Sequence, residues 1–160
     1  MTAPIDKAAL VRELGVQLAA ALTTAQRAHA AAIEGSTHAE ARAENSKDTR
    51  GLEQSYLARG QAVRVGELEA AVVELARFAP RAFAPTAAIA LGAVVTIDEA
   101  GAPSRIFLAP HGGGIVLAGD VQVVTPASPL GRALLGKRAG DDVEVTLPGR
   151  TRSLSIDAVS

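Results

Sequence analysis

Cysteine and tryptophan are absent from the 160-residue sequence, and aromatic residues make up only 2% of it. Without cysteine there is no disulfide, no thiolate metal site, no iron–sulfur cluster and no cysteine nucleophile. With one tyrosine and three phenylalanines, the chain has almost no side chains on which single-stranded bases could stack. These absences exclude cysteine-dependent catalysis and argue against a sheet that reads RNA by stacking.

An excess of charge and a long apolar run are also missing. Sixteen Lys and Arg against seventeen Asp and Glu give a formal charge of −1, so no global basic field attracts nucleic acid. The longest strongly apolar run, residues 87–95, is too short to span a membrane, and the first residues contain no apolar core of a signal peptide. We therefore expect a cytoplasmic protein without a membrane partner, built from one or two small domains.

The first half of the chain has helical periodicity. Apolar residues recur at alternating spacings of three and four at positions 11, 14, 18, 21, 25, 28 and 32, and again, with one shift, at 52, 56, 65, 68, 72 and 75. This pattern is typical of a coiled-coil seam. Residues 35–37 combine a glycine that stops helices with residues that cap them, so a chain reversal is expected there. The sequence predicts an antiparallel helical hairpin that starts near Thr2 and Pro4.

The second half has the pattern of a β domain, because β-branched runs alternate with glycine and proline turns after Pro80 and Pro85. Six strands are predicted at residues 89–97, 105–109, 115–117, 121–125, 143–147 and 154–159. One short helix is predicted from Pro129, with Ser128 as its cap, to Leu135. The expected fold class is therefore α+β, with a coiled-coil hairpin domain at 1–79 and an antiparallel β domain carrying one short helix at 80–160.

One run of the second half is the most informative motif. It reads TPASPLGRALLGKRAGDDVEV over residues 125–145 and is followed by Leu147, Pro148 and Gly149. This run resembles the C-terminal part of the Gre transcript-cleavage factors, a bacterial family of a coiled-coil hairpin followed by a small FKBP-like β domain. Glu44 and Asn45 lie where Gre factors carry the acidic tip of their hairpin. The resemblance therefore covers nearly the whole chain.

The resemblance implies that RNA polymerase is the partner. In such a factor the β domain docks at the rim of the secondary channel, and the hairpin reaches the polymerase active site, in indirect contact with nascent RNA and DNA. Tip carboxylates there help to hold a catalytic Mg²⁺, a cation that prefers oxygen ligands, together with a water. The candidate carboxylates are Glu44, Asp48 and Glu40. The free chain is expected to hold no metal or cofactor of its own and to act as an accessory factor rather than as an enzyme.

The tip departs from the family pattern. Ala41 stands where Gre factors carry an aspartate three residues before the glutamate, so one carboxylate of the usual pair is missing. Three basic residues between positions 42 and 50 add positive charge that opposes the gathering of a second metal ion. Helix capping also accounts for acids at Glu44 and Asp48. A cleavage factor and a non-cleaving regulator on the same scaffold both stay open.

Arg132, Lys137 and Arg138 form a compact basic group in the second domain and are the candidate residues for docking on the polymerase, although an ordinary charged surface accounts for them as well. A rival function of another class is that of an FKBP-like prolyl isomerase. Such sites are lined by aromatic side chains, whereas the second domain holds only Phe83 and Phe107. A coiled-coil oligomerisation module is a further alternative, and the self-packing of the hairpin argues instead for a monomer.

The histidines and the glycine run have simpler interpretations than metal or phosphate binding. His29, His38 and His111 lack the spacing of metal ligands. We expect His29 to face water and the other two to lie in loops. The three glycines at 112–114 lack the following helix that a phosphate-binding loop needs, so they predict a turn.

Overall fold

The computed structural model describes residues 3–41 and 50–160 of the chain. Two compact units are present: one combines Met1–Leu14 with Glu74–Ser160, and the other is Gly15–Val73. The predicted domain boundary between residues 79 and 80 stays a prediction.

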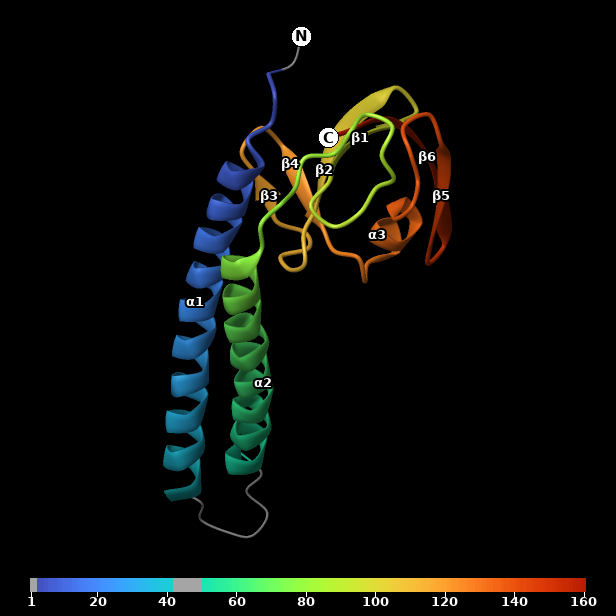
Figure 1. Ribbon diagram of the computed structural model, residues 1–160. Coiled ribbons are helices and arrows are strands. Elements are labelled where there is room, and N and C mark those ends of the chain that lie inside the picture. The colour runs from blue at the N-terminus through green and yellow to red at the C-terminus, as the bar shows by residue number, and fades with distance from the viewer. Residues whose placement is uncertain (1–2, 42–49) are drawn as a thin grey trace. The chain divides into compact units, whose positions relative to one another are not determined.

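Two long helices form the first half of the chain. Helix α1 is Lys7–Ala41 and helix α2 is Arg50–Arg77. Within Gly15–Val73 they run side by side in opposite directions (Figure 1). Asp6 caps α1, because its Oδ1 accepts a hydrogen bond from the N–H of Ala9 at 3.0 Å. The helical hairpin is confirmed, and its predicted start lies a few residues too early.

The predicted reversal at residues 35–37 is wrong, since α1 continues through them. Thr37 Oγ1 donates to the carbonyl oxygen of Ile33 at 3.1 Å, a bond that threonine makes inside helices. One glycine costs a helix only about 1 kcal/mol relative to alanine, so the alanine-rich flanks outweigh it. A Cβ on Gly35 would lie 3.0 Å from Oε1 of Gln54 in α2. Glycine here therefore gives the neighbouring helix room rather than ending its own.

The predicted seam of α1 is confirmed. Leu14, Leu18, Ala25 and Ala32 are buried, as is Leu10 one turn before them. The remaining predicted positions, 11, 21 and 28, are half-buried. The alternating spacing thus identified the buried face of α1, where removal of apolar side chains from water stabilises the fold.

The predicted seam of α2 holds in its second half alone. Leu68 and Leu75 are buried, whereas Leu52 and Tyr56 are 55% and 60% exposed. The first turns of α2 bury Gly51 instead. Leu52 and Tyr56 have the predicted spacing from each other, but they lie on the exposed side of α2. The buried side there includes small residues such as Gly51, which a search for apolar residues does not detect.

His29 lies between the two helices rather than facing water, so that prediction is wrong. Its ring is half-buried, and Nδ1 lies 3.1 Å from the carbonyl oxygen of Ala58 in α2. An imidazole can approach this backbone carbonyl because the side chain of Ala58 is small. The contact links α1 to α2 by a polar bond inside an otherwise apolar hairpin.

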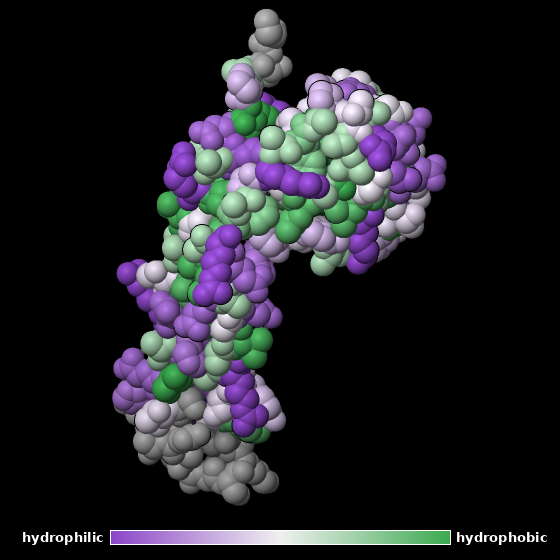
Figure 2. All heavy atoms as spheres, in the orientation of Figure 1, coloured by the Kyte–Doolittle hydropathy of each residue, from purple (hydrophilic) through white to green (hydrophobic). Residues whose placement is uncertain are grey.

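The outer faces of the helices carry apolar side chains among charged ones. The exposed large apolar residues are Val16, Ile33, Leu52, Tyr56, Leu57, Val63 and Val73. Hydrophilic and hydrophobic residues are intermixed on the face of the helices that Figure 2 shows. Scattered apolar exposure of this kind is normal for a protein surface.

The second half of the chain contains one six-stranded sheet. Its strands are β1 Val94–Glu99, β2 Ala102–Leu108, β3 Val116–Leu117, β4 Val121–Val124, β5 Asp142–Leu147 and β6 Arg150–Val159, in the spatial order β3-β4-β2-β1-β6-β5. Strands β2 and β4 pair in parallel, and the other neighbours are antiparallel. The α+β fold class is confirmed. The expectation of a wholly antiparallel sheet is wrong at the β2–β4 pair, because β4 returns beside β2 after the intervening loop and β3.

The first predicted strand, residues 89–97, begins later than expected, at Val94. Gly92 interrupts the extended run with a φ of 92°, and a Cβ there would lie 3.4 Å from the ring of Phe78. Ile89 is still buried, and its N–H donates to the carbonyl oxygen of Lys137 at 2.7 Å. The segment before β1 is therefore held against the turn that follows the short helix.

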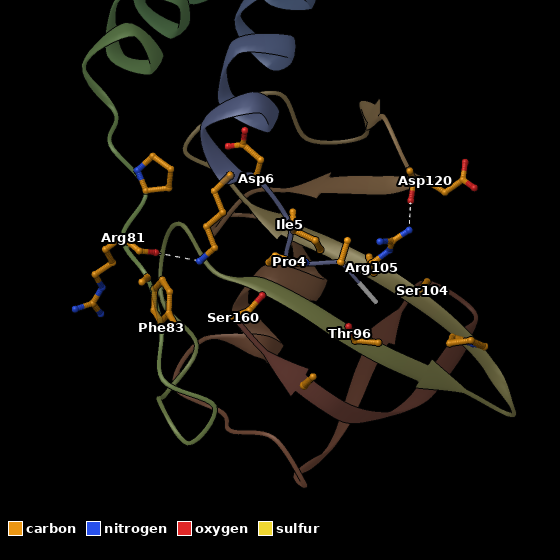
Figure 3. Close-up of a pocket in the computed structure, with 17 residues that line it drawn as sticks. Pro4, Ile5, Asp6, Arg81, Phe83, Thr96, Ser104, Arg105, Asp120 and Ser160 are labelled. Carbon is orange, nitrogen blue, oxygen red and sulfur yellow. Dashed lines mark hydrogen bonds between the residues drawn. The ribbon is translucent and has the colours of Figure 1, made fainter. Parts of the chain in front are cut away.

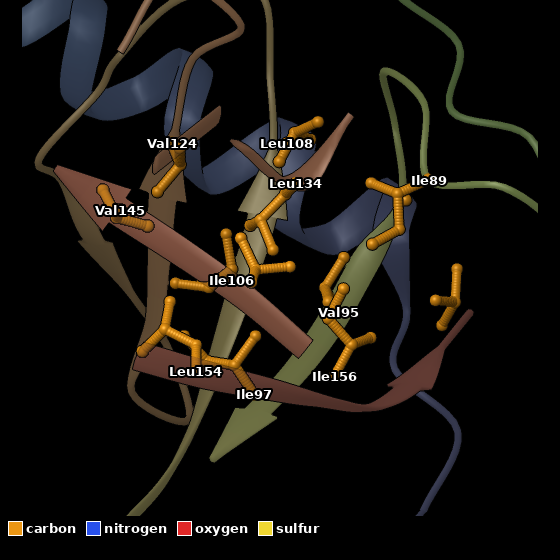
Figure 4. Packing of buried hydrophobic residues seen from close by; sticks show 13 residues of the cluster. Ile89, Val95, Ile97, Ile106, Leu108, Val124, Leu134, Val145, Leu154 and Ile156 are labelled. Atoms are coloured by element: carbon orange, nitrogen blue, oxygen red, sulfur yellow. The ribbon is translucent and has the colours of Figure 1, made fainter. Parts of the chain in front are cut away.

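The core of this unit lies between the sheet and helix α3, which is Pro129–Leu134. Its largest members are aliphatic: Ile89, Val95, Ile97, Ile106, Leu108, Val124, Leu134, Val143, Val145, Leu154, Ile156 and Val159 (Figure 4). Leu134 brings α3 into this cluster. Helix α3 begins as predicted, with Ser128 at the cap and proline in the first turn.

One ion pair crosses the sheet and gives a pH prediction. Arg152 of β6 donates to the carboxylate of Glu99 in β1, with Nε and Nη2 at 3.0 and 2.6 Å from its oxygens. These hydrogen bonds lower the pKa of Glu99. A carboxyl group whose folded pKa is depressed contributes stability above its unfolded pKa and loses it as the pH falls through the folded one.

We therefore expect the melting temperature of the wild-type chain to fall more steeply with acid below about pH 4 than that of Glu99→Gln. Thermal melts followed by circular dichroism at a series of pH values measure the difference. Parallel pH profiles for the two proteins would contradict a stabilising role for the pair.

Candidate functional site

The turn into α3 is closed by a compact set of hydrogen bonds. Ser128 Oγ accepts from the N–H of Gly131 at 3.0 Å and donates to the carbonyl oxygen of Thr125 at 2.8 Å. A Cβ on Gly131 would lie 2.0 Å from that same carbonyl oxygen. The serine and the glycine of this motif thus have separate tasks: one satisfies the helix start, and the other leaves space for the backbone that folds over it.

The three predicted docking residues are exposed on α3 or just after it. Arg132 Nη1 donates to the carbonyl oxygen of Ala127 at 2.8 Å, and Arg138 Nη1 donates to that of Thr86. No ion pair of Lys137 is found within the described residues. The backbone therefore orients both arginines, and Lys137 presents its charge to solvent.

Two exposed apolar side chains accompany this basic group. Leu135, directly after α3, is 36% exposed, and Leu91 is 38% exposed. The segments that carry them adjoin, because the N–H of Gly136 donates to the carbonyl oxygen of Ile89 at 2.8 Å. We call the set the α3 surface: Arg132, Lys137, Arg138, Leu91 and Leu135. A surface that mixes cations with aliphatic groups suits a protein partner with acidic and apolar side chains.

Sequence reasoning missed Leu91. It lay inside the predicted strand 89–97, and no residue of that strand was predicted to be exposed. The residue is exposed because Gly92 ends the extended pattern before β1 begins. A glycine within a run of apolar residues was the one available signal, since it often marks a bend.

The predicted tip carboxylates are not placed by the structure. Glu44 and Asp48 lie outside the described residues, and Glu40 belongs to the last turn of α1 without a described side chain. Their proposed roles stay predictions. In residues 3–41 and 50–160, no group of three or more His, Cys, Asp or Glu side chains could hold a metal ion.

The other two histidines are placed as follows. His111 lies in the loop between β2 and β3, as predicted, with Nε2 2.6 Å from Oε2 of Glu74. His38 lies inside α1 rather than in a loop, with Nε2 3.5 Å from Oε1 of Glu34 one turn earlier. The loop prediction for His38 was wrong for the same reason as the predicted reversal at residue 35.

The glycine run 112–114 forms a turn, as predicted. The N–H of Gly114 donates to the carbonyl oxygen of Val123 at 2.9 Å, so it does not point to solvent as an anion cradle requires. Gly112 has a φ of 89°, and a Cβ there would lie 2.6 Å from Cδ1 of Leu14. The run serves chain reversal and close packing.

The two phenylalanines of the second half do not form an aromatic-lined site. Phe107 is fully buried, so it cannot contact a ligand at the surface. Phe83 carries two cations over its ring, with Lys7 Nζ and the guanidinium carbon of Arg81 4.5 and 4.7 Å from its centre. This arrangement does not favour the prolyl isomerase alternative.

None of the described helices is both long enough and apolar enough to cross a membrane. A comparison with curated proteins found no match.

The chain was compared with protein families and with solved structures. Residues 84–160, just under half of the chain, match the family model described as "Transcription elongation factor, GreA/GreB, C-term". The crystal structure of GreA factor homolog 1 (Gfh1) of Thermus thermophilus is similar at 21% identity and a TM-score of 0.40, covering 91% of this chain and 94% of that one. The corresponding values for Thermus aquaticus Gfh1 are 21%, 0.41, 89% and 91%.

A third chain, the prokaryotic transcription elongation factor GreA/GreB from Nitrosomonas europaea, is similar at 23% identity and a TM-score of 0.38, covering 58% of this chain and 78% of that one. The family match includes the whole α3 motif and all six strands, so the resemblance inferred from residues 125–149 is confirmed. Residues 84–160 are therefore similar to the C-terminal domain of the GreA/GreB family of transcription elongation factors.

Proposed function

We propose that this chain binds RNA polymerase and modulates transcription elongation as a Gre-type factor. The observation that carries the proposal is the family match of residues 84–160, in a chain whose preceding half is an antiparallel pair of long helices. The β domain supplies the docking surface in this proposal, and the helices carry residues 42–49 to the secondary channel. The chain has no need of a catalytic pocket of its own, because the chemistry belongs to the polymerase.

The α3 surface is the proposed docking site. Its arginines are oriented by bonds to Ala127 and Thr86, which reduces the conformational entropy that binding would otherwise cost. Leu91 and Leu135 supply apolar area beside the charges. Arginine with aliphatic side chains is a composition suited to recognising a partner helix or loop that carries acids.

Reversal of one charge tests this surface. Lys137→Glu is expected to weaken binding to core RNA polymerase roughly fivefold at low salt, because a charge at the rim of an interface contributes on the order of 1 kcal/mol. The difference should shrink as salt is raised, since screening removes it. Pull-down or interferometry at two salt concentrations measures it. Arg150→Glu, which reverses the charge of the first residue of β6, is the control, and equal affinities for both variants at low salt would refute the surface.

The proposed role of the tip is to present carboxylates at the polymerase active site. Glu44, Asp48 and Glu40 have the oxygen donors that Mg²⁺ prefers. When bound, the ion would activate a water and stabilise the leaving oxygen during hydrolysis of backtracked RNA. The part of this chain is to donate ligands and to orient the water.

The tip is tested by removing charge without changing shape. Glu44→Gln and Asp48→Asn are each expected to lower stimulated RNA cleavage about 100-fold, since ligands of a catalytic metal contribute several kcal/mol to the barrier. Polymerase affinity should be unchanged. Glu34→Gln, which alters an acid of α1 beside His38, is the control and should cleave normally. Unaltered cleavage by both tip variants would remove them from the mechanism.

A non-cleaving regulator is the second candidate, and the sequence of the tip favours it. Ala41 replaces one carboxylate of the family's pair, and Arg42 and Lys47 bring positive charge to the same stretch. Such a factor would compete for the secondary channel without stimulating hydrolysis. Binding without cleavage by the wild-type chain selects this candidate.

A further inference from the structure

A hollow of about 1030 Å³ lies in the unit formed by the N-terminal segment and the sheet. Its floor is the face of β1 and β2 opposite the aliphatic core, with Thr96 on it. Residues 3–7 before and at the start of α1 form one wall, and residues 80–83 form another (Figure 3). Its volume lies at the upper end of the range of small-molecule sites. Neither the α3 surface nor the tip includes any of these residues.

One end of the hollow brings two cations together on a single ring. Lys7 Nζ and the Arg81 guanidinium both lie over Phe83, and Nζ also donates to the carbonyl oxygen of Arg81 at 3.0 Å. Burial and the charge of Arg81 lower the pKa of Lys7. The aromatic ring offsets part of this repulsion, but no carboxylate is paired with either cation in the described part of the chain. The pair therefore lacks a matching negative charge.

The acids of the hollow do not supply that charge. Asp6 has other partners: its Oδ1 accepts a hydrogen bond from the N–H of Ala9 at 3.0 Å, and its Oδ2 lies 3.8 Å from Nη2 of Arg12. Asp120 lies at the other end beside Arg105 (Figure 3). Arg105 itself donates to the carbonyl oxygen of Gly119 at 2.6 Å. Side chains of the hollow thus comprise three cations and two acids, and the unmatched charge is at the end with Lys7 and Arg81.

The rest of the lining is apolar and rigid. Ile5 and Phe83 present side chains to the hollow, and prolines at 4, 80 and 103 line it as well. Proline has a fixed φ, so these walls lose little entropy when a ligand binds. The hydroxyl group of Thr96 is available as a hydrogen-bond partner on the floor.

We propose that this hollow binds a small organic anion, with its phosphate or carboxylate group bonded to Lys7 and Arg81 and its apolar body against Ile5 and Phe83. The ammonium of Lys7 makes one hydrogen bond and has two N–H groups left for the ligand. Bonds between such cations and an oxyanion are about twice as strong as neutral ones. The anion also removes the repulsion between the two cations. The inference does not depend on binding to RNA polymerase.

The test uses 8-anilinonaphthalene-1-sulfonate, an aromatic anion that becomes fluorescent in apolar surroundings. The full chain is titrated with this probe, together with Lys7→Met, Arg81→Met and the control Arg150→Met, which removes the same charge from the first residue of β6. We expect each pocket variant to bind the probe at least tenfold more weakly and the control to bind it as the wild type does. Equal affinity in all four proteins would overturn the proposal.

Loss of folding cannot imitate this result, because a loosened chain exposes apolar surface and its probe fluorescence rises instead of falling. A second readout separates a ligand site from a structural contact. Lys7→Met should melt at the same temperature as the wild type or higher, since it removes a cation whose charged form the fold disfavours. A large drop in melting temperature would show that Lys7 is a structural residue, against the proposal.

Competition identifies the charged group of the ligand. Phenyl phosphate, benzoate and benzyl alcohol share one aromatic ring and differ in the group attached to it. At constant ionic strength we expect phenyl phosphate or benzoate to displace the probe, and the stronger competitor names the group. Equal displacement by benzyl alcohol, or displacement by none of the three, would contradict an oxyanion site.

Discussion

Gly131→Ala is expected to destabilise the β domain by about 2–3 kcal/mol, the size of an overpacked core substitution. The added Cβ would lie 2.0 Å from the carbonyl oxygen of Thr125 and 2.8 Å from its carbon. That carbonyl cannot move freely, because it accepts hydrogen bonds from both the N–H and the Oγ of Ser128. Either the cap of α3 breaks or the helix shifts off the core cluster that Leu134 joins.

Thermal unfolding followed by circular dichroism should show a melting temperature about 10 °C lower for this variant. Gly60→Ala is the matched control. It is the same change inside a helix, but a Cβ at position 60 has no neighbour within 4 Å. Alanine there should stabilise α2 by roughly 1 kcal/mol. Equal effects of the two substitutions would show that contact with Thr125 does not decide the cost.

Leu68→Asp is expected to separate the two helices of the hairpin, because an unpaired carboxylate would be buried between them. The free energy of unfolding should fall by about 3 kcal/mol or more. Leu68 is 3% exposed and lies near Ala71, which is also buried. Long helices in water depend on an apolar partner rather than on propensity, and three glycines of α2 weaken it further. We expect a large part of the helical signal to melt at a lower temperature.

Leu52→Asp makes the same chemical change at a position that is 55% exposed. It should alter the melt by less than about 0.5 kcal/mol, as surface substitutions do. The two leucines were predicted to share one seam, and the structure separates them. A cost at position 52 as large as that at 68 would mean that the first turns of α2 are buried after all.

Local patterns predicted much of this fold. The alternating spacing identified Leu14, Leu18 and Ala25 as buried, and Ser128 with Pro129 identified the start of α3. These features depend on neighbours in sequence, which periodicity and capping rules describe well. The fold class followed because the change of period near residue 78 is sharp.

What the sequence did not predict depends on contacts between distant segments. The pairing of β2 with β4 in parallel is decided by the path of the chain between them. Gly35 was taken as a helix end, whereas it lies inside α1, where an added Cβ would meet Gln54 of the other helix. In the sequence, a glycine that ends a helix looks the same as a glycine that makes room for a neighbouring helix. His29 was misplaced for the same reason, since its partner Ala58 lies in the other helix.

The candidate site was predicted unevenly. Arg132, Lys137 and Arg138 are exposed as a docking role requires, but nothing in their sequence marked Leu91 as a neighbouring apolar residue. The pair of Lys7 and Arg81 is separated by most of the helical hairpin in sequence, so no local pattern could have joined them. The tip residues Glu44 and Asp48 stay predictions that come from the family resemblance.

Purified core RNA polymerase, halted in deliberately backtracked complexes with Mg²⁺, provides the most direct test of the central claim. The full chain is added, and binding and RNA cleavage are measured in the same preparation. Our account predicts binding that competes with a Gre factor for the secondary channel, whether or not cleavage is stimulated. Absence of binding at low salt, by a chain that melts cooperatively, would contradict it.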